Sequence, residues 1–443
     1  MSSEVVPDTL DLFTEQPSLV SVGGSFYERI KCSTNLSPLP EALEFVANAD
    51  RSHYTDLSNS FLLVRTAYRK TSDGSALAAT PEVGPVQNLH GSLFKSIDMK
   101  INNKKITPPE TNNPYISWFY HFTMPKTAQD TYLKSAGWSD DNYESELILQ
   151  QGNPAAVANK NEGLTERAAS YSMGKEPTLV GKIYAAPHMT KRFLLPNCKI
   201  EWNMKLEDHK FYTMQKQTLG DNDYTLVIKD AEIWLKRVEV SPAIYTAHQK
   251  LLASGKNAVY PAKYIESRAQ SIPQGSYSFK FDNVFQGYNM PLAVFAFFVD
   301  SEAKSGHLQK NPFFLETANL ADLRCYLGSK VFPSTMYKFD SRKTGYEAGL
   351  QDTFLALDVP GSPFGPGQLN KNTFPCCFIL GFDLTRDHNT LANYNNSDFD
   401  STSLSIEGSF TQATTKPYTV IVLGLFNGQF ELDRFIEPVT TWN

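Results

Sequence analysis

Two short motifs in this sequence match those around the nucleophile of a serine acyltransferase. Residues 92–95 (SLFK) fit the pattern SxxK, and residues 343–345 are KTG. That chemistry needs the serine at the start of a buried helix beside an α/β sheet. Ser92 instead leads into residues whose apolar and polar side chains alternate, which is typical of a strand. We therefore interpret both matches as coincidental.

No set of metal-binding side chains stands out either. The eight histidines form no HxH or HExxH pair; they are His53, His90, His121, His188, His209, His248, His307 and His388. Cys376 and Cys377 are adjacent, so on a strand their side chains point to opposite faces and fit one zinc ion poorly. The sequence predicts no metal site and no cofactor.

Acidic side chains are the remaining candidates for chemistry. Glycoside hydrolysis needs two carboxylates on either side of the scissile bond, and Asp140, Asp141 and Asp383 are available. Acidic residues in loops are usually solvated, however, and nothing in the sequence brings two of them together. We therefore predict that the protein is not an enzyme. No activity is expected to depend on Ser92, His188, Asp140 or Cys376.

The composition is that of a globular protein. The 443 residues are 41% hydrophobic and 20% charged, enough for two to three domains with their own cores. A net charge of −6 argues against a coat that neutralises nucleic acid directly. No run of 18 apolar residues predicts a membrane span, and the acidic N-terminal segment does not resemble a signal peptide. Five scattered cysteines indicate free thiols in a reducing compartment.

A short phrase occurs twice in the chain. Residues 96–109 (SIDMKINNKKITPP) and 322–335 (DLRCYLGSKVFPST) each alternate apolar and polar side chains, turn, and return. Residues 97–101 align with 323–327 at an offset of 327 − 101 = 226 residues, close to half the chain. One interpretation is chance, because β-hairpins look alike. The other is two similar β domains whose hairpins occupy equivalent, inward-facing strands.

Strands dominate the rest of the sequence. The expected strands are 56–68, 224–240 with a bulge near Asp230, 291–300 buried on both faces, 374–385 and 416–433. Asn427-Gly428 predicts a hairpin turn within the last of these. Polar stretches predict elaborate loops at 139–176, 341–373 and 386–403.

Helices are few. One is expected after Asn113, capped by that residue, and a second from Thr127 to Gly137. A third, capped by Ser241 and ended by Gly255, lies almost at the midpoint, and we interpret its His248 as a packing residue. It predicts the junction between domains. The expected divisions are an N-terminal arm at 1–25, a first domain at 26–240, a linker helix at 241–258 and a second domain at 259–443.

Several phrases together resemble the major capsid protein, or hexon, of Polinton (Maverick) and adintovirus-type elements. In the first half these are DLFTEQP (11–17), DLSNSFLLVRTAY (56–68), VGPVQNLHGSLFKSIDMKINNKKI (83–106) and NPYISW (113–118). In the second half they are DNVFQGYNMPLAVFAFFVDSEAKSG (282–306), NPFFLE (311–316) and GFDLTRD (381–387). The order and spacing of the phrases carry the resemblance. The loops at 139–176 and 341–373 match no pattern, and the chain is short for a virophage-type hexon.

The resemblance implies an all-β fold: two tandem eight-stranded antiparallel jelly rolls, with a few short helices in loops and at the domain junction. It implies a homotrimer that forms a pseudo-hexagonal capsomer and tiles an icosahedral shell around double-stranded DNA. The implied partners are neighbouring capsomers, a penton protein with a single jelly roll and minor capsid proteins, without sequence-specific binding of nucleic acid. The protein would be made and assembled inside the host cell, in the cytoplasm or nucleus, and reside in the virion capsid.

A function of a different class stays open. Two jelly rolls could also form a carbohydrate-binding protein or a glycan-active enzyme. Such a protein would be marked by a groove lined with aromatic side chains and by a carboxylate pair.

The N-terminal arm carries apolar residues in a polar, glycine-ended segment: Val5-Val6, Leu10, Leu12-Phe13 and Leu19-Val20. An isolated segment cannot bury such side chains, so we expect them to dock on a neighbouring subunit or an inner-shell protein. The alternative is that the arm packs on its own domain or is disordered.

Overall fold

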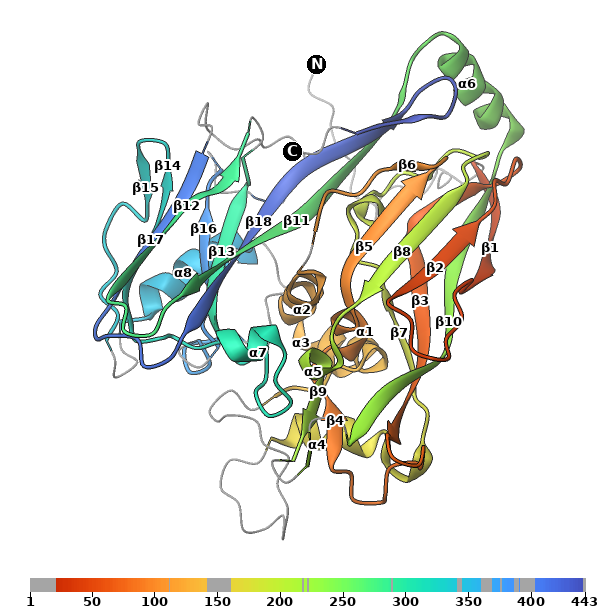
Figure 1. Cartoon of the computed structure of the whole chain (residues 1–443). Coiled ribbons are helices and arrows are strands. Elements are labelled where there is room, and N and C mark those ends of the chain that lie inside the picture. The colour runs from red at the N-terminus through yellow and green to blue at the C-terminus, as the bar shows by residue number, and fades with distance from the viewer. Residues whose placement is uncertain are drawn as a thin grey trace, which may run out of the picture.

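Two β domains lie side by side in the computed structural model, and α6 (Pro242–Ala253) joins them at one end of the molecule (Figure 1). The structure describes residues 21–110, 112–141, 161–216, 219–220, 223–287, 290–340, 345–359, 369–374, 377–385, 390 and 403–440. The arm up to residue 20, Lys343, Cys376, His388 and parts of the three long loops lie outside these residues.

The first domain is built from two antiparallel four-stranded sheets. One sheet has the order β1 (Val22–Lys31), β10 (Tyr224–Val240), β3 (Tyr54–Lys70) and β7 (Thr178–Lys182). The other has the order β2 (Ala42–Ala47), β8 (Ile200–Leu206), β5 (Phe94–Ile101) and β6 (Lys104–Lys105). A short pair, β4 (Val83–Pro85) and β9 (Thr213–Gln215), lies at the end opposite α6 (Figure 1).

The second domain repeats this arrangement. Its first sheet has the order β11 (Ala258–Ile272), β18 (Tyr418–Leu432), β13 (Ala293–Asp300) and β16 (Leu380–Asp383), with β19 (Pro438–Thr440) beside β18. Its second sheet has the order β12 (Ser278–Gln286), β17 (Ser403–Phe410), β14 (Leu320–Leu327) and β15 (Lys330–Phe332). Each strand except β19 has a counterpart in the first domain, and the prediction of two antiparallel jelly rolls is confirmed.

The repeated phrase forms the same hairpin in both rolls. β5 and β6 turn at Asn102-Asn103, where both residues have positive φ, and β14 and β15 turn at Gly328, which also has positive φ. Each hairpin ends its sheet at the same edge. The aligned side chains all point inward: Ile97, Met99 and Ile101 in the first roll, and Leu323, Cys325 and Leu327 in the second, are at most 8% exposed.

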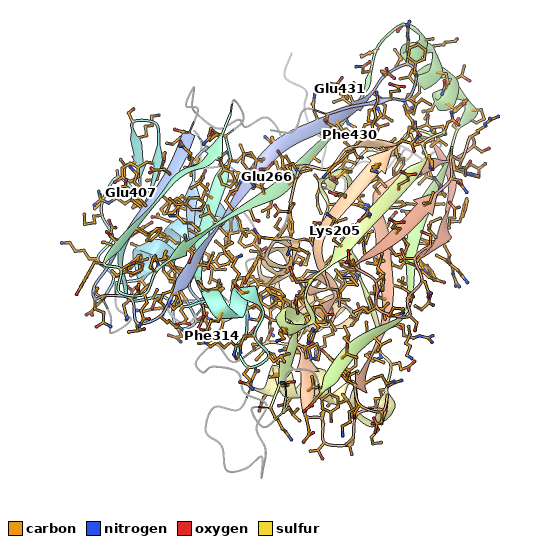
Figure 2. All side chains as sticks on the ribbon, in the orientation of Figure 1. Lys205, Glu266, Phe314, Glu407, Phe430 and Glu431 are labelled. Atoms are coloured by element: carbon orange, nitrogen blue, oxygen red, sulfur yellow. The ribbon has the colours of Figure 1, made fainter. Side chains whose placement is uncertain are left out.

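Alternation of side chains fixes which face of each strand is buried. On β3, Leu62 and Val64 are buried, whereas Phe61 and Leu63 are half-buried on the outer face. On β13 every residue is buried, as the uninterrupted apolar run predicts. Buried side chains of both rolls belong to one continuous hydrophobic core, and side chains fill the space between the sheets (Figure 2). The predicted bulge near Asp230 is confirmed by a register shift between Ile228 and Asp230 against β3.

The helices lie in the connections between strands. They are α1 (Leu89–Ser92), α2 (Asn113–Phe122), α3 (Lys126–Asp130), α4 (Glu162–Ala169), α5 (His209–Tyr212), α7 (Ser301–Ser305) and α8 (Glu347–Ala356), with 3-10 turns η1 (Tyr132–Ala136), η3 (Ser172–Gly174) and η4 (Ala186–Met189). The helix predicted at the midpoint is α6, and Gly255 follows it with positive φ. All strands before α6 pair with one another, as do all strands after it. The division at 26–240, 241–258 and 259–443 therefore stands as our proposal for two folding units.

The predicted hairpin turn at Asn427-Gly428 is wrong. Both residues lie within β18, and their backbones pair with Lys263 and Ala262 of β11. Neither residue has positive φ, which a tight turn of this type needs at both positions. The physical reason is β11, which offers a hydrogen-bonding edge along the whole length of β18, so the chain continues straight.

The predicted helix caps are also wrong in detail. Asn112 occupies the cap of α2 because the side chain of Asn113 donates instead to the carbonyl oxygen of Phe94 (3.1 Å). The helix predicted to start at Thr127 begins one residue earlier, with Pro125 at its cap. Ser241 does occupy the cap of α6, but its side chain makes no capping hydrogen bond.

Met99 tests the inward orientation of the repeated hairpin. Met99 is fully buried, so Met99→Ala is expected to lower the free energy of unfolding by about 2–5 kcal/mol through lost packing and a cavity. Its neighbour Lys100 is exposed on the other face, and Lys100→Ala is expected to stay within about 0.5 kcal/mol of the parent. Urea unfolding followed by tryptophan fluorescence measures both; equal losses for the two variants would contradict the register.

Candidate functional site

The serine of the SxxK motif is buried in the core of the first roll. Ser92 ends α1, is fully buried, and its hydroxyl donates to the carbonyl oxygen of Gln87 at 3.4 Å. Lys95 lies on the exposed side of β5, where its ammonium is 3.9 Å from the carboxylate of Glu207. Residues 343 and 344 of the KTG motif lie outside the described residues. The arrangement agrees with the interpretation that the SxxK match is coincidental.

Three histidines are buried packing residues. The ring of His90 contacts the carbonyl oxygen of Leu62 (3.1 Å). His188 contacts the carbonyl oxygen of Leu57 (2.9 Å) and accepts a hydrogen bond from the indole of Trp202 (3.0 Å). Burial lowers the pKa of His90 and of His188 to about 4. In the folded protein these rings are neutral near pH 7.

His121 is the third buried histidine, and it has no hydrogen-bond partner at either ring nitrogen. Its ring packs edge-on against Trp138 and Tyr184, with ring centres 5.8 and 5.2 Å apart. Burial, with a smaller contribution from the nearby His90, lowers the pKa of His121 to about 3. His248, predicted to be a packing residue, is half-buried on α6, and its Nδ1 lies 2.8 Å from the hydroxyl of Tyr54.

The three aspartates do not form a carboxylate pair. Asp140 is half-buried and forms an ion pair with Lys126. Asp383 accepts hydrogen bonds from the backbone N–H (2.8 Å) and hydroxyl (2.7 Å) of Thr385. The expectation that acidic loop residues are solvated is wrong for Asp141 and Asp383, which are both buried. Within the described ranges, no group of three or more histidine, cysteine or carboxylate side chains could hold a metal ion.

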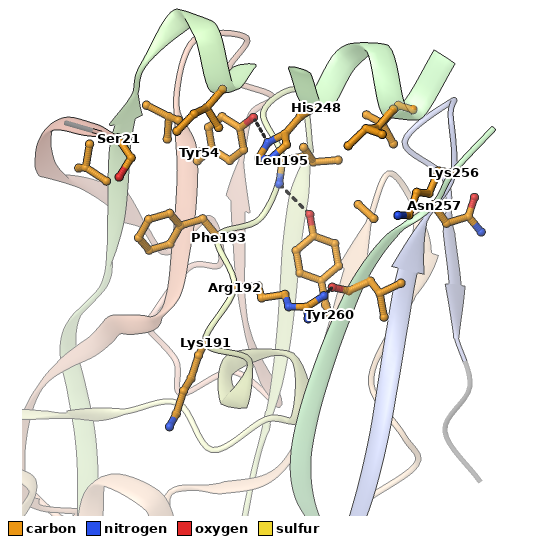
Figure 3. A pocket seen from close by; sticks show the side chains of 17 residues that line it. Ser21, Tyr54, Lys191, Arg192, Phe193, Leu195, His248, Lys256, Asn257 and Tyr260 are labelled. Carbon is orange, nitrogen blue, oxygen red and sulfur yellow. Dashed lines mark hydrogen bonds between the residues drawn. The ribbon is translucent and has the colours of Figure 1, made fainter. Parts of the chain in front are cut away.

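A cavity of about 550 Å³ lies beside α6 (Figure 3). Aromatic side chains line part of it, among them Tyr54, Phe193 and Tyr260. None of the described residues that line it is acidic, so the carboxylate pair expected of a glycan-active enzyme is missing from this cavity. Among the described residues, no helix combines the length and the apolar character needed to cross a membrane.

The most elaborate constellation of buried groups lies at the junction between the two rolls. At its centre the carboxylate of Asp141 accepts a hydrogen bond from the guanidinium of Arg167 (2.6 Å) on α4, and both side chains are at most 3% exposed. The other carboxylate oxygen accepts from the amide of Asn311 (3.2 Å), which belongs to the second roll. Arg167 also donates to the carbonyl oxygens of Ser139 (2.7 Å) and Pro85 (2.9 Å). The pair is thus compensated on both sides and ties the rolls together.

Helix α2 is an apolar wedge between the rolls. The ring of Trp118 stacks on that of Phe313 at 5.7 Å, and Phe119 packs on Phe295 at 4.7 Å. Tyr115 contacts Phe297 with ring centres 5.9 Å apart. Phe295 and Phe297 belong to β13 and point away from the core of their own roll, so α2 covers the outer face of the sheet β11-β18-β13-β16. The complete burial of β13 follows from this cover.

Polar contacts border the wedge. The carboxylate of Glu110 accepts from the backbone N–H (2.9 Å) and the hydroxyl (2.7 Å) of Ser267 on β11. Next to Ser267 on β11 is Glu266 (Figure 2); burial raises its pKa, and the negative charge of Glu110 also raises it. At the α6 end, the amide of Asn102 in the β5–β6 turn donates to the carbonyl oxygen of Ile436 (2.8 Å). The junction therefore extends along the length of the rolls.

The corresponding face of the first roll is partly exposed in the part of the chain that the structure describes. On the outer side of the sheet β1-β10-β3-β7, the rings of Tyr27, Phe61 and Trp234 lie 5.2–6.1 Å apart, and Arg29 lies over Trp234 at 4.5 Å. We call these four residues the outer aromatic patch. Tyr27 is 43% exposed. The patch occupies on β1, β10 and β3 the side that α2 covers on β11, β18 and β13.

Sequence reasoning missed the residues of this junction. Arg167 lies on α4, within a stretch expected to be a loop, and the 170 residues between Asp141 and Asn311 in the chain hide their contact. A usable signal was present in α2, where Tyr115, Trp118, Phe119 and Phe122 are spaced as one face of a helix and are all buried. Such a face on a loop helix predicts a buried contact but does not say with which part of the chain.

Acid is expected to destabilise the protein through the buried histidines. A histidine whose pKa is lower when folded than when unfolded contributes stability that is complete above about pH 6.5 and falls as the pH drops toward the folded pKa, by about 1.4 kcal/mol per pH unit for each ring. His121→Phe keeps the ring contacts and removes one titrating group. The loss of unfolding free energy from about pH 6 to about pH 5 should then shrink by about 1 kcal/mol.

Urea unfolding at the two pH values measures this difference. A pH dependence that is the same in the His121→Phe variant and the parent would rule out this account.

Removal of the buried carboxylate at the junction should be costly. Asp141→Ala leaves the Arg167 guanidinium buried without its counter-charge, so we expect a loss of about 3–5 kcal/mol in unfolding free energy. Glu166 is the control on the same helix: its ion pair with Lys134 is more than half exposed at the Glu166 side chain, and Glu166→Ala should cost about 1 kcal/mol or less. Denaturant unfolding compares the two variants, and similar losses would show that Asp141 is not a structural tie.

Comparisons with known proteins bear on the fold. No model of a protein family matches the sequence, and no curated protein matches it. Among solved structures, the chain is similar to a chain of the Sputnik virophage, with a TM-score of 0.62 and 13% identity over 100% of this chain and 93% of that one. It is also similar to the mavirus major capsid protein (TM-score 0.57, 11% identity, 100% and 95% covered). A third similar structure is the Faustovirus major capsid protein (TM-score 0.57, 8% identity, 96% and 92% covered). The chain thus has the double jelly-roll fold that viral major capsid proteins share.

Proposed function

We propose that the chain is a major capsid protein whose trimers form pseudo-hexagonal blocks of an icosahedral shell around double-stranded DNA. The observation that carries the proposal is a difference in burial between two equivalent sheet faces, the outer sides of β11-β18-β13-β16 and of β1-β10-β3-β7. Among the described residues, α2 of the first roll buries one of these faces, and the other carries the partly exposed outer aromatic patch. The likeness in fold to viral major capsid proteins supports the same conclusion.

The duplicated topology suggests how the open face is covered. Within the chain, the segment between β6 and β7 of the first roll carries α2 onto the outer face of the second roll's sheet. The corresponding segment of the second roll runs from β15 to β16 and holds α8. The rotation that relates the first roll to the second can be applied again to the second roll. It then places the segment from β15 to β16, with α8, against the outer aromatic patch of another copy. Such a head-to-tail interface closes into a ring when the rotation allows it, and six rolls make a ring of three chains.

The chemistry of the chain agrees with a structural role. The junction buries a compensated ion pair and aromatic rings, which hold the rolls in one orientation. The net charge of −6 suits a shell that surrounds DNA without neutralising it. We propose neighbouring capsomers, a penton protein and minor capsid proteins as partners, with assembly inside the host cell, and kinship with the Polinton and adintovirus-type hexons that the sequence resembles.

Native mass and electron microscopy test the proposal. Light scattering coupled to size-exclusion chromatography should give three times the 49.6 kDa of one chain. Negative-stain images should show three-fold blocks or shells. We expect more than about 2,000 Å² of buried surface at each contact, the range of obligate assemblies. A monomer at micromolar concentrations that binds a glycan would favour the carbohydrate-binding alternative.

Tyr27 tests the proposed contact. Tyr27→Asp places a charge on the outer aromatic patch and should convert the trimer to monomer with little change in the melting temperature of the isolated fold, because the side chain is already 43% exposed in one chain. Met173 offers a control: it is 70% exposed in η3 and does not belong to the outer aromatic patch, and Met173→Asp should leave the trimer intact. A trimer that survives Tyr27→Asp would exclude this face as the interface.

A further inference from the structure

The cavity beside α6 is a preformed apolar groove. Its walls come from α6, from the start of β11 and from residues 191–195 (Figure 3). Hydrogen bonds connect two of these walls, residues 191–195 and the start of β11. The hydroxyl of Tyr260 accepts from the backbone N–H of Leu195 (3.1 Å), and Arg192 donates to the carbonyl oxygen of Val259 (2.7 Å). On the third wall, His248 of α6 lies 2.8 Å from the hydroxyl of Tyr54, so the walls are connected to one another by hydrogen bonds.

The groove combines exposed apolar surface with positive charge. Leu251 on α6 is 48% exposed and Phe193 is 36% exposed, although both line a concave surface of mostly apolar side chains. Lys191, Arg192 and Lys256 also line it, and no described lining residue carries a negative charge. The matching occupant is therefore apolar and acidic.

The first described residues of the chain lie at this groove. Ser21 and Val22 are lining residues, and the carbonyl oxygen of Ser21 accepts from the backbone N–H of Ser241 (3.0 Å) immediately before α6. The 20 residues that precede Ser21 include Leu10, Leu12 and Phe13. They contain four carboxylates and no lysine or arginine; the acidic residues are Glu4, Asp8, Asp11 and Glu15.

We propose that residues 8–15 of the same chain fold back into the groove as an intramolecular strap. The apolar side chains of Leu10, Leu12 and Phe13 lie against the apolar walls, and the neighbouring carboxylates face the three cationic side chains. The eight Cα–Cα steps from Phe13 to Ser21 span up to about 27 Å when extended, which is long enough to extend across a cavity of about 550 Å³. Its attachment at the mouth gives it a high effective concentration there, which favours the chain's own arm over another copy.

A labelled synthetic peptide of residues 1–20 tests the strap. A chain that lacks residues 1–20 should bind the peptide saturably in fluorescence anisotropy, and added salt should weaken the binding, because carboxylates meet cations. The affinity of the full-length chain for the peptide should be at least about tenfold lower, because its own arm competes for the groove. A peptide with Leu12→Asp and Phe13→Asp should fail to bind. Equal binding by the full-length and shortened chains would overturn the intramolecular strap, and no binding by the shortened chain would overturn the groove as its site.

Matched variants locate the site. Leu251→Asp in the shortened chain puts a negative charge at the groove on an already exposed position, so it should weaken peptide binding about tenfold or more. Leu39→Asp, at a leucine 37% exposed outside the groove, should leave binding unchanged. If the shortened chain does not fold, the full-length chain with Leu12→Asp and Phe13→Asp in its own arm replaces it and should bind the unaltered peptide. These measurements do not involve assembly, so a negative result leaves the capsid proposal untouched.

Discussion

The outer face of the sheet β11-β18-β13-β16 is apolar, and the rest of the structure is organised around covering it. Most jelly-roll sheets need only one buried face, because the other meets solvent. Here β13 carries phenylalanines on both sides, with Phe298 in the core of its own roll and Phe295 and Phe297 directed outward. A roll with such a face is incomplete by itself. The first roll completes it with α2, and the connection that carries α2 determines where the two rolls meet.

Polar groups then set the orientation of this apolar contact. Aromatic surfaces alone can slide past one another, whereas a buried carboxylate that is hydrogen-bonded to donors from both rolls is satisfied in one geometry. Asp141 holds Arg167 on one side and Asn311 of the second roll on the other. Glu110 and Ser267 do the same near the edge of the wedge. The apolar wedge supplies most of the buried area, and the polar contacts select the arrangement in which all of their hydrogen bonds form.

Local patterns predicted the strands well and the contacts between distant segments poorly. The repeated hairpins were predictable because alternation and the residues at each turn act over ten positions, within a single hairpin. The turn expected at Asn427-Gly428 failed for the opposite reason: β11, more than 150 residues earlier in the chain, provides the strand that keeps β18 straight. Asp141 was expected to be solvated because its neighbours are polar, yet its environment is set by Arg167 and Asn311. Residues far away in the chain determine whether such a side chain is buried, and a single sequence does not identify those residues.

The molecule has two unlike ends along the direction of its strands. Ser21 contacts Ser241 next to α6, and β19 pairs with the end of β18 that itself pairs with the start of β11. Both ends of the described chain and the link between the rolls therefore gather at one pole. The opposite pole holds α4, β4 and β9 and the connections that lead to them (Figure 1). Changes of length in those connections that leave Asp141 and Arg167 in place do not alter the linked pole, which keeps the spacing of the two rolls constant.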